Sequence, residues 1–292
     1  RPNAIARSLS KNNTKMIGVI LPDITHPFFS QIYVEAEKAG LNKDYNTILS
    51  NTMNEKELEY VSIKALMDKQ VDGMIFMGGR IDMISPPEKY IEELKQVSEQ
   101  IPLVLINGNK HGIDCYQVKT DARKAFTNGL NYLNSLGHKK IGLLGGVKGI
   151  APSELKFNIF DKTAEEMGFI SKDSWKIHRG LSIKNGIEAM KKLVENSEEL
   201  PTAIITINDS VAIGALRYAN KNGIKVPGDI SIIGYDNIYL SDIFDLTTIS
   251  HDYEKLGKLA VDIIDKVNKG KSVAKKHMVS ANLIKRNSCK TI

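Results

Sequence analysis

The chain has 292 residues, of which 42% are hydrophobic and 25% charged, an ordinary composition for a globular protein. This length exceeds the size at which one hydrophobic core usually keeps growing, so we expect two domains or lobes. No apolar run approaches the roughly 18 residues that cross a bilayer, and no leader pattern opens the chain, so we expect a cytoplasmic protein without a membrane anchor. The two cysteines, Cys115 and Cys289, are too few for a disulfide framework or a metal cluster.

The formal net charge of +6 is unevenly distributed along the chain. Residues 1–15 carry four basic side chains and no acidic one, and residues 269–292 carry seven basic side chains and no acidic one, so the middle of the chain is acidic overall. A basic end on an acidic body indicates that a polyanion meets a terminus rather than the body. The alternative is that both basic ends are simply solvated.

The first ten residues predict a short helix, with Asn3 as its cap and good helix formers from Ala4 to Leu9. A helix this short does not hold alone in water, where about 12–15 residues are needed, so it should fold only against a partner. Residues 11–15 follow as a polar linker. The first residue is Arg and the motif is already under way, so we expect a fragment of a longer protein.

From residue 16 onward, strand and helix patterns alternate. The first set of strands is expected at 16–21, 47–50, 71–76 and 103–107, with helices at 28–39, 55–68, 90–97 and 121–136. The second set has strands at 140–144, 175–177, 202–207 and 230–233, helices at 153–167, 183–194 and 210–220, and then a helix at 253–267 and a strand at 279–284. Such alternation predicts βαβ units, and hence an α/β fold of two similar lobes, each a parallel sheet flanked by helices.

Residues 226–236 predict a short buried strand that delivers one carboxylate to a ligand. Asn222 and Gly223 close the preceding helix, the isoleucines at 230–233 suit a strand covered on both faces, and Gly234 is expected to end it. In open α/β sheets, ligands bind outside the carboxyl ends of the strands, where Asp236 would lie. Asp236 is therefore a candidate ligand contact, and the alternative is a polar turn.

The sequence carries none of the common catalytic or cofactor motifs. The glycine-rich stretch at 142–149 matches neither G-x-G-x-x-G nor G-x-x-x-x-G-K-[ST], which argues against a nucleotide site. There is no H-E-x-x-H, no G-x-S-x-G and no cysteine pair for zinc. Because no nucleophile stands with a base, we expect a binding protein that uses no cofactor or metal, and not an enzyme.

Six motifs together resemble the lac repressor/galactose repressor family of bacterial transcription regulators. They are R-P-N-A-I-A-R-S-L at 1–9, I-G-V-I-L-P-D at 17–23 with P-F-F at 27–29, V-D-G-M-I at 71–75, G-H-K-K-I at 137–141, N-D at 208–209 with I-G-A at 213–215, and the stretch 226–237. The resemblance covers nearly the whole chain. Several motifs in the right order are far more specific than any one of them.

The resemblance implies a hinge helix followed by an effector-binding core like that of type I periplasmic sugar-binding proteins. It also implies an N-terminal helix-turn-helix that this chain lacks. Family cores cross between lobes three times, and spacing puts the crossings near 136–140, 249–253 and 269–274. The expected division is a hinge and linker at 1–15, an N-terminal lobe at 16–137 plus 253–270, and a C-terminal lobe at 138–250 plus 271–292, with the effector between the lobes.

The resemblance also implies site residues. In the hinge, Leu9 matches the leucine that wedges into the DNA minor groove, with Asn3 and Ala6 on the same helix. The positions that resemble effector contacts come from both lobes. They are Phe28 and Phe29, which pack a ligand ring, Asp121, a polar contact from the N-terminal lobe, Asn208 and Asp236, which hydrogen-bond, and His251, a glutamine-like position in the strand that crosses between the lobes. For Phe28 and Phe29 the alternative is plain helix core.

Two departures from the family pattern concern the effector. Many members have R-x-x-G-[YF] in the second lobe, and this chain has Lys156 where the arginine would reach the effector; lysine keeps the charge but loses the planar fork. Leu181 stands where a ring would stack. These departures argue against a conventional sugar pose, and the alternative is that Lys156 meets an anionic group of a phosphorylated effector.

The predicted function is a DNA-binding repressor of a carbohydrate-utilisation operon, controlled by a sugar or sugar phosphate. Its expected partners are operator DNA, the small effector and a second copy of the chain in a homodimer. Two alternatives stay open. One is a catabolite-control regulator whose co-repressor is a phosphorylated carrier protein, and the other is an exported sugar-binding protein of the same fold. The sequence leaves open whether the effector induces or co-represses, and whether the assembly is a dimer or a tetramer.

Overall fold

The computed structural model describes residues 13–292, so the hinge positions Asn3, Ala6 and Leu9 lie outside the described residues. The described chain divides into two compact units, each of which is an α/β sandwich. Unit 1 comprises the chain up to Thr120 together with Asp252–Val279. Unit 2 comprises Asp121–His251 together with Ser280–Ile292.

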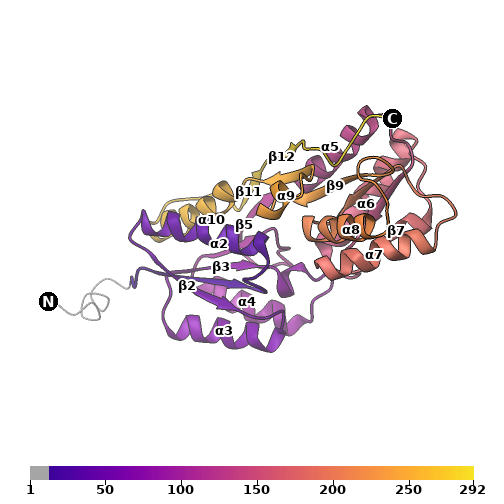
Figure 1. Cartoon of the computed structure of the whole chain (residues 1–292). Coiled ribbons are helices and arrows are strands. Elements are labelled where there is room, and N and C mark those ends of the chain that lie inside the picture. The colour runs from indigo at the N-terminus through magenta and orange to yellow at the C-terminus, as the bar shows by residue number, and fades with distance from the viewer. Residues whose placement is uncertain (1–12) are drawn as a thin grey trace. The chain divides into compact units, whose positions relative to one another are not determined.

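In the described part of unit 1, six parallel strands form one sheet in the order β11-β5-β4-β3-β1-β2. The strands are β1 (Met16–Leu21), β2 (Asn46–Asn51), β3 (Gly73–Met77), β4 (Leu103–Ile106), β5 (Tyr116–Thr120) and β11 (Lys276–Val279). Its helices are α2 (Pro27–Leu41), α3 (Lys56–Asp68), η1 (Gly79–Asp82), α4 (Glu88–Gln100) and α10 (Tyr253–Asn268). Figure 1 shows α2 and α10 on one face of this sheet and α3 and α4 on the other.

Both faces of this first sheet are apolar, as parallel sheets require. On one face, alternate residues of β1 such as Ile17 and Val19 pack with α2 and α10, and on the other, Ile20 packs with α3 and α4. The helix pair α2 and α10 lies very close, because Gly257 leaves room for the backbone of Ala36. Pro27 begins α2 at a position where its missing N–H costs nothing.

The described residues of unit 2 also form a six-stranded sheet, in the order β12-β10-β9-β8-β6-β7. Its strands are β6 (Ile141–Leu144), β7 (Lys176–Ile177), β8 (Ala203–Thr206), β9 (Ser231–Asp236), β10 (Thr248–His251) and β12 (Ala281–Ile284), of which β12 runs antiparallel to β10. Its helices are α5 (Ala122–Ser135), α6 (Ala151–Met167), η2 (Asp173–Trp175), α7 (Ile183–Glu195), α8 (Asp209–Lys221) and α9 (Tyr239–Ile243). Helices α5 and α6 cover one face and α7 and α8 the other.

Local sequence signals explain how the helices of unit 2 begin and end. Ser182 and Asn185 form a capping box at the start of α7, and Asn208 caps α8 by accepting a hydrogen bond from the N–H of Val211. Gly168 ends α6 in the left-handed conformation that glycine adopts without strain.

The two six-stranded sheets, each covered by helices on both faces and parallel except for β12, confirm the predicted α/β fold of two similar lobes.

The structure corrects several predicted elements. The expectation that Gly234 ends its strand is wrong, because β9 continues to Asp236. The single strand expected at 279–284 is two strands, because the chain leaves the first sheet after Val279 and enters the second at Ala281. Strand β5 was not among the expected elements, and β10 was expected only through the family resemblance, as the strand that carries His251. Their polar residues hide a strand pattern, since one is Y-Q-V-K-T and the other T-I-S-H.

The unit boundaries also differ from those expected at 137 and 270. Helix α5 belongs to unit 2, because its buried residues Phe126, Leu130 and Leu133 pack into the same core as Ile205 and Ile249 of that unit. Strand β11 belongs to unit 1, where it pairs with β5. Within residues 13–292, no helix is long and apolar enough to cross a membrane.

Candidate ligand-binding site

Strands β9 and β10 of unit 2 end side by side, and their last residues form a buried polar pair. Asp236 ends β9 and His251 ends β10, its parallel neighbour, with Ser250 in register with Asp236. Nε2 of His251 lies 3.2 Å from Oδ1 of Asp236, and the two residues are only 7% and 6% exposed. The structure thus brings together two of the predicted effector residues at a strand end, where open α/β sheets bind ligands.

The backbone at this strand end is in an uncommon conformation. Asp236 has a φ of 119° and Asn237 a φ of 57°, both in the region that non-glycine residues rarely adopt. Such conformations persist only where the surrounding structure fixes them, and they cluster at functional sites. The turn after β9 is therefore a position that the fold holds at a cost.

Lys156 of α6 reaches the same strand end from the face of the sheet that α5 and α6 cover. Its Nζ donates a hydrogen bond of 2.7 Å to the carbonyl of Ile207 and lies 3.5 Å from the ring centre of Tyr235. Burial lowers the pKa of Lys156 to about 8, while the nearby carboxylates of Asp236 and Asp209 act in the opposite direction. The ammonium of Lys156 is therefore held inside the unit, on a carbonyl and an aromatic face.

Asn208 and Asp121 cap helices at this edge. Asn208 is 5% exposed, its side-chain oxygen caps α8, and its amide donates a hydrogen bond of 2.9 Å to the carbonyl of Leu181. Asp121 belongs to unit 2 and not to the N-terminal lobe as expected, because α5 packs into the core of unit 2. Its side chain caps α5 by accepting from the N–H of Lys124. Asp121 also lies close enough to Tyr235 to help raise the pKa of its phenol, after burial and Asp236.

Two residues at this edge were not assigned from the sequence. The hydroxyl of Tyr235 is buried and hydrogen-bonds to no described residue. Asp209, the residue after the α8 cap, is fully buried and accepts three hydrogen bonds. The sequence signal for the burial of Asp209 is that it begins a helix whose next residues, Val211 to Ala215, are all apolar or glycine.

The aromatic pair predicted to pack a ligand ring belongs to unit 1. Phe28 and Phe29 lie in the first turn of α2, with ring centres 5.1 Å apart and planes at 76°. Both are partly buried and pack against the core beneath α2, and Phe28 also contacts Tyr253 at 6.0 Å. Both rings therefore contribute to the core beneath α2, as the alternative to a ligand-packing role predicts.

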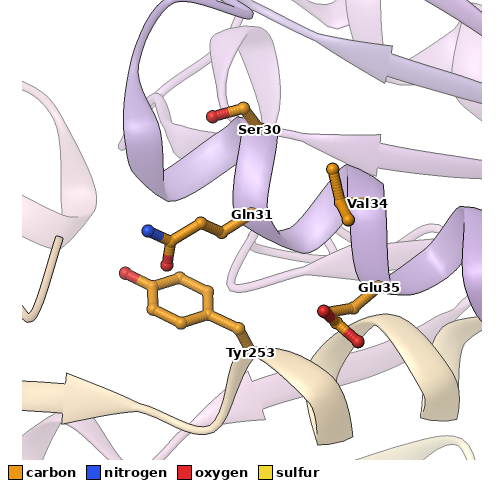
Figure 2. Close-up of a pocket in the computed structure, with 5 residues that line it drawn as sticks. All are labelled: Ser30, Gln31, Val34, Glu35 and Tyr253. Atoms are coloured by element: carbon orange, nitrogen blue, oxygen red, sulfur yellow. The ribbon is translucent and has the colours of Figure 1, made fainter. Parts of the chain in front are cut away.

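Two surface pockets lie near these groups without containing a predicted site residue. Figure 2 shows the first, a pocket of about 380 Å³ in unit 1, where Tyr253 and Gln31 face each other beside Ser30, Val34 and Glu35. The second is a pocket of similar size in unit 2, lined by Gly146, Val147, Lys148, His178, Arg179, Gly180, Asn185 and Glu188. In the second pocket the Arg179 guanidinium is already paired with Glu188 at 2.8 Å.

The chemistry of the β9–β10 edge is that of a hydrogen-bond acceptor site. Among the described side chains at this edge, the buried carboxylates of Asp209 and Asp236 lie near the buried ammonium of Lys156. The guanidinium of Arg286 bonds the neighbouring Asn237 and is paired with Asp242. No group of three or more His, Cys, Asp or Glu residues within 13–292 is arranged to hold a metal ion. The edge can therefore accept hydrogen bonds from hydroxyls, as a sugar requires.

Comparison with known proteins gives a consistent family. Residues 130–289 match a family described as periplasmic binding protein-like domain. The chain is 32% identical to Catabolite control protein A of Priestia megaterium over 91% of this chain and 79% of that protein, and 33% identical to the HTH-type transcriptional repressor PurR of Haemophilus influenzae over 90% and 76%. A LacI family transcriptional regulator from Enterococcus faecium, solved with bound ribose, superposes with a TM-score of 0.80 at 25% identity, over 95% of this chain and 99% of that one.

Proposed function

This chain belongs to the lac repressor/galactose repressor family of transcription regulators, and we propose that a small, uncharged polyhydroxy ligand bound at the Asp236–His251 edge of unit 2 controls its binding to operator DNA. The DNA-reading part would be the hinge segment and a preceding helix-turn-helix, as in the relatives named transcriptional repressors. The proposed working form is a homodimer on a two-fold symmetric operator.

The observation that carries this proposal is the buried Asp236–His251 pair at a strand end. A carboxylate and an imidazole 3.2 Å apart can accept and donate hydrogen bonds to neighbouring hydroxyls of one sugar ring. The fold neighbour solved with ribose supports a sugar as the ligand class. The predicted roles of Phe28 and Phe29 in packing the ligand ring stay predictions.

An uncharged ligand is favoured over a phosphorylated one by the charges at this edge. Asp236 and Asp209 would repel a phosphate, and both are buried where repulsion is weakly screened. The ammonium of Lys156, which the sequence offered as a partner for an anion, already donates to the carbonyl of Ile207 and rests on the ring of Tyr235. We therefore propose that Lys156 balances the carboxylates instead of meeting a phosphate.

Exposed apolar residues on unit 2 support the homodimer. Tyr239 and Ile243, one turn apart on α9, are 65% and 69% exposed, and the adjacent Phe244 is 44% exposed. Clustered large apolar side chains on a surface commonly mark a protein interface. Sedimentation equilibrium on the chain, compared with an Ile243→Glu variant, tests whether α9 lies in the interface; a variant that remains dimeric contradicts this placement.

The test of the ligand site is calorimetry with a panel of pentoses, hexoses, disaccharides and their phosphates. We expect an uncharged sugar to bind, and we expect Asp236→Asn to weaken it by about tenfold to a hundredfold, since a hydrogen bond to a charged group contributes roughly 1.5–3 kcal/mol. The matched control is Asp173→Asn, which removes an exposed carboxylate of the same unit. Unchanged affinity in Asp236→Asn would show that the site is misplaced.

The link to transcription is tested on the full-length protein. A ligand can shift an equilibrium between two states only by its differential affinity for them, and the coupling is reciprocal. Operator DNA should therefore change the affinity for the sugar by the same factor by which the sugar changes the affinity for operator. A sugar that binds equally with and without operator would leave this site unconnected to DNA binding.

A second candidate function is catabolite control by a partner protein. The 32% identity to Catabolite control protein A favours it. In that case no sugar of the panel would bind with useful affinity, and a phosphorylated carrier protein would strengthen operator binding by itself. The calorimetric panel therefore also separates the two candidates.

A further inference from the structure

The carboxylate of Asp209 is a buried junction of three hydrogen bonds. Its Oδ2 accepts from the backbone N–H of Ile238 at 2.9 Å and from the hydroxyl of Ser241 at 2.6 Å. Its Oδ1 accepts from the hydroxyl of Thr248 at 2.5 Å. Asp209 and both hydroxyl donors are fully buried. Since its side chain has no exposed surface, Asp209 can act on a ligand only through the residues it holds.

These hydrogen bonds bracket the strained turn that presents Asp236. Ile238 follows directly after Asp236 and Asn237, the two residues with positive φ. On the other side, β9 passes so close to the carboxylate that a Cβ at Gly234 would overlap Oδ1 of Asp209. The carboxylate thus touches the chain both before and after the turn, which is the kind of surrounding that an uncommon backbone conformation requires.

Thr248 connects Asp209 to the neighbouring strand β10. Its hydroxyl donates to Asp209 and accepts from the N–H of Asn237 at 3.3 Å. Thr248 is the first residue of β10 and lies in register with Gly234 of β9, and β10 ends three residues later at His251. One carboxylate therefore contacts both the turn after β9 and the start of the strand that carries His251, while Ser250 and Arg286 hold the side chain of Asn237.

We propose that Asp209 is a positioning residue of the ligand site: through Ile238, Ser241 and Thr248 it sets the geometry in which Asp236 and His251 are presented together. This inference rests on the proposed function for the identity of the site. Burial, reinforced by the nearby Asp236, raises the pKa of Asp209 to about 6, while the three hydrogen bonds that it accepts favour the ionised form.

The test compares four variants of the whole chain. Asp209→Asn removes one acceptor, Thr248→Val removes the relay at nearly constant shape, and Thr248→Ser restores its hydroxyl. Ser231→Ala is the matched control, because the Ser231 hydroxyl is also buried in unit 2 and accepts from the N–H of Lys290 at the first residue of β9, the end away from Asp236. The measurements are amide hydrogen exchange at Asn237 and Ile238 and calorimetric affinity for the best-binding uncharged sugar.

We expect Asp209→Asn and Thr248→Val to lose exchange protection at both amides and to bind the sugar at least tenfold more weakly. Thr248→Ser should keep protection and affinity close to wild type. Ser231→Ala should do the same at this turn, whatever its effect on stability. If Asp209→Asn fails to fold, the comparison of Thr248→Val with Thr248→Ser decides the question alone.

The outcomes separate this inference from the proposed function. A wild-type chain that binds sugar, with affinity lost in Asp236→Asn but kept in Asp209→Asn and Thr248→Val, overturns the positioning role and leaves the site intact. A wild-type chain that binds no sugar contradicts the proposed function, and hydrogen exchange then decides the inference: unchanged protection at Asn237 and Ile238 in Asp209→Asn overturns it, and loss of protection confined to that turn supports it.

Discussion

The buried ammonium of Lys156 should give unit 2 a stability that increases at alkaline pH. The ordinary pKa of a lysine is 10.5, and burial lowers that of Lys156 to about 8. Each pKa unit corresponds to about 1.4 kcal/mol. At neutral pH the free energy of unfolding is therefore about 3 kcal/mol lower than it would be if the charged Lys156 kept its ordinary pKa. Replacing it with methionine, which has similar length and no charge, removes the titration.

The sign follows from which state binds the proton. Below about pH 8 the lysine is protonated in both the native and the unfolded states, and stability does not depend on its titration. Between about pH 8 and pH 10.5 the unfolded state keeps the proton and the native state releases it, so the free energy of unfolding rises with pH. Between pH 7 and pH 10 this rise should amount to about 2.5 kcal/mol.

The assay is urea denaturation of the wild type, Lys156→Met and Lys162→Met at half-unit pH intervals from 7 to 10. Lys162 lies on the same helix with a largely exposed side chain, so its variant controls for the loss of one lysine from α6. The free energy of unfolding of the wild type minus that of Lys156→Met should increase by about 2.5 kcal/mol from pH 7 to pH 10. The same quantity for Lys162→Met should not change with pH. Parallel pH curves for wild type and Lys156→Met would refute the reasoning.

Two further predictions concern packing. Arg80 is 1% exposed and pairs with Glu59 and Glu93, so Arg80→Ala leaves buried carboxylates without their partner and should lower the free energy of unfolding by about 3–5 kcal/mol, as measured by urea denaturation. Gly214 of α8 lies against the backbone of Ile183 at the start of α7, where a Cβ would overlap the Ile183 carbonyl oxygen. Gly214→Ala should therefore lower the free energy of unfolding by about 1–3 kcal/mol. A melting temperature equal to that of wild type in Gly214→Ala would contradict this close helix packing.

The alternation of apolar strands with capped helices was readable from the sequence because both signals are local. A strand such as Met16–Leu21, which is buried on both faces, is a continuous run of apolar residues. Helices such as α8 begin directly after a capping residue. The same locality put Asp236 just beyond an isoleucine-rich run. Where polar residues interrupt the apolar pattern, as in β5 and β10, the local signal failed and the strands are formed by pairing with their neighbours.

The site itself depends on residues that meet only in the folded chain. Asp209 and Thr248 are 39 positions apart, and Lys156 and Ile207 are 51 apart, so no spacing rule links them. The sequence determined that a carboxylate and an asparagine would stand at strand and helix ends. Only the tertiary structure, by bringing the ends of β8, β9 and β10 to one edge of the sheet, decided that Asp209 would be buried near Asp236 and that the Lys156 ammonium would be buried with them. Burial and hydrogen-bond partners depend on neighbouring segments and not on the local chain.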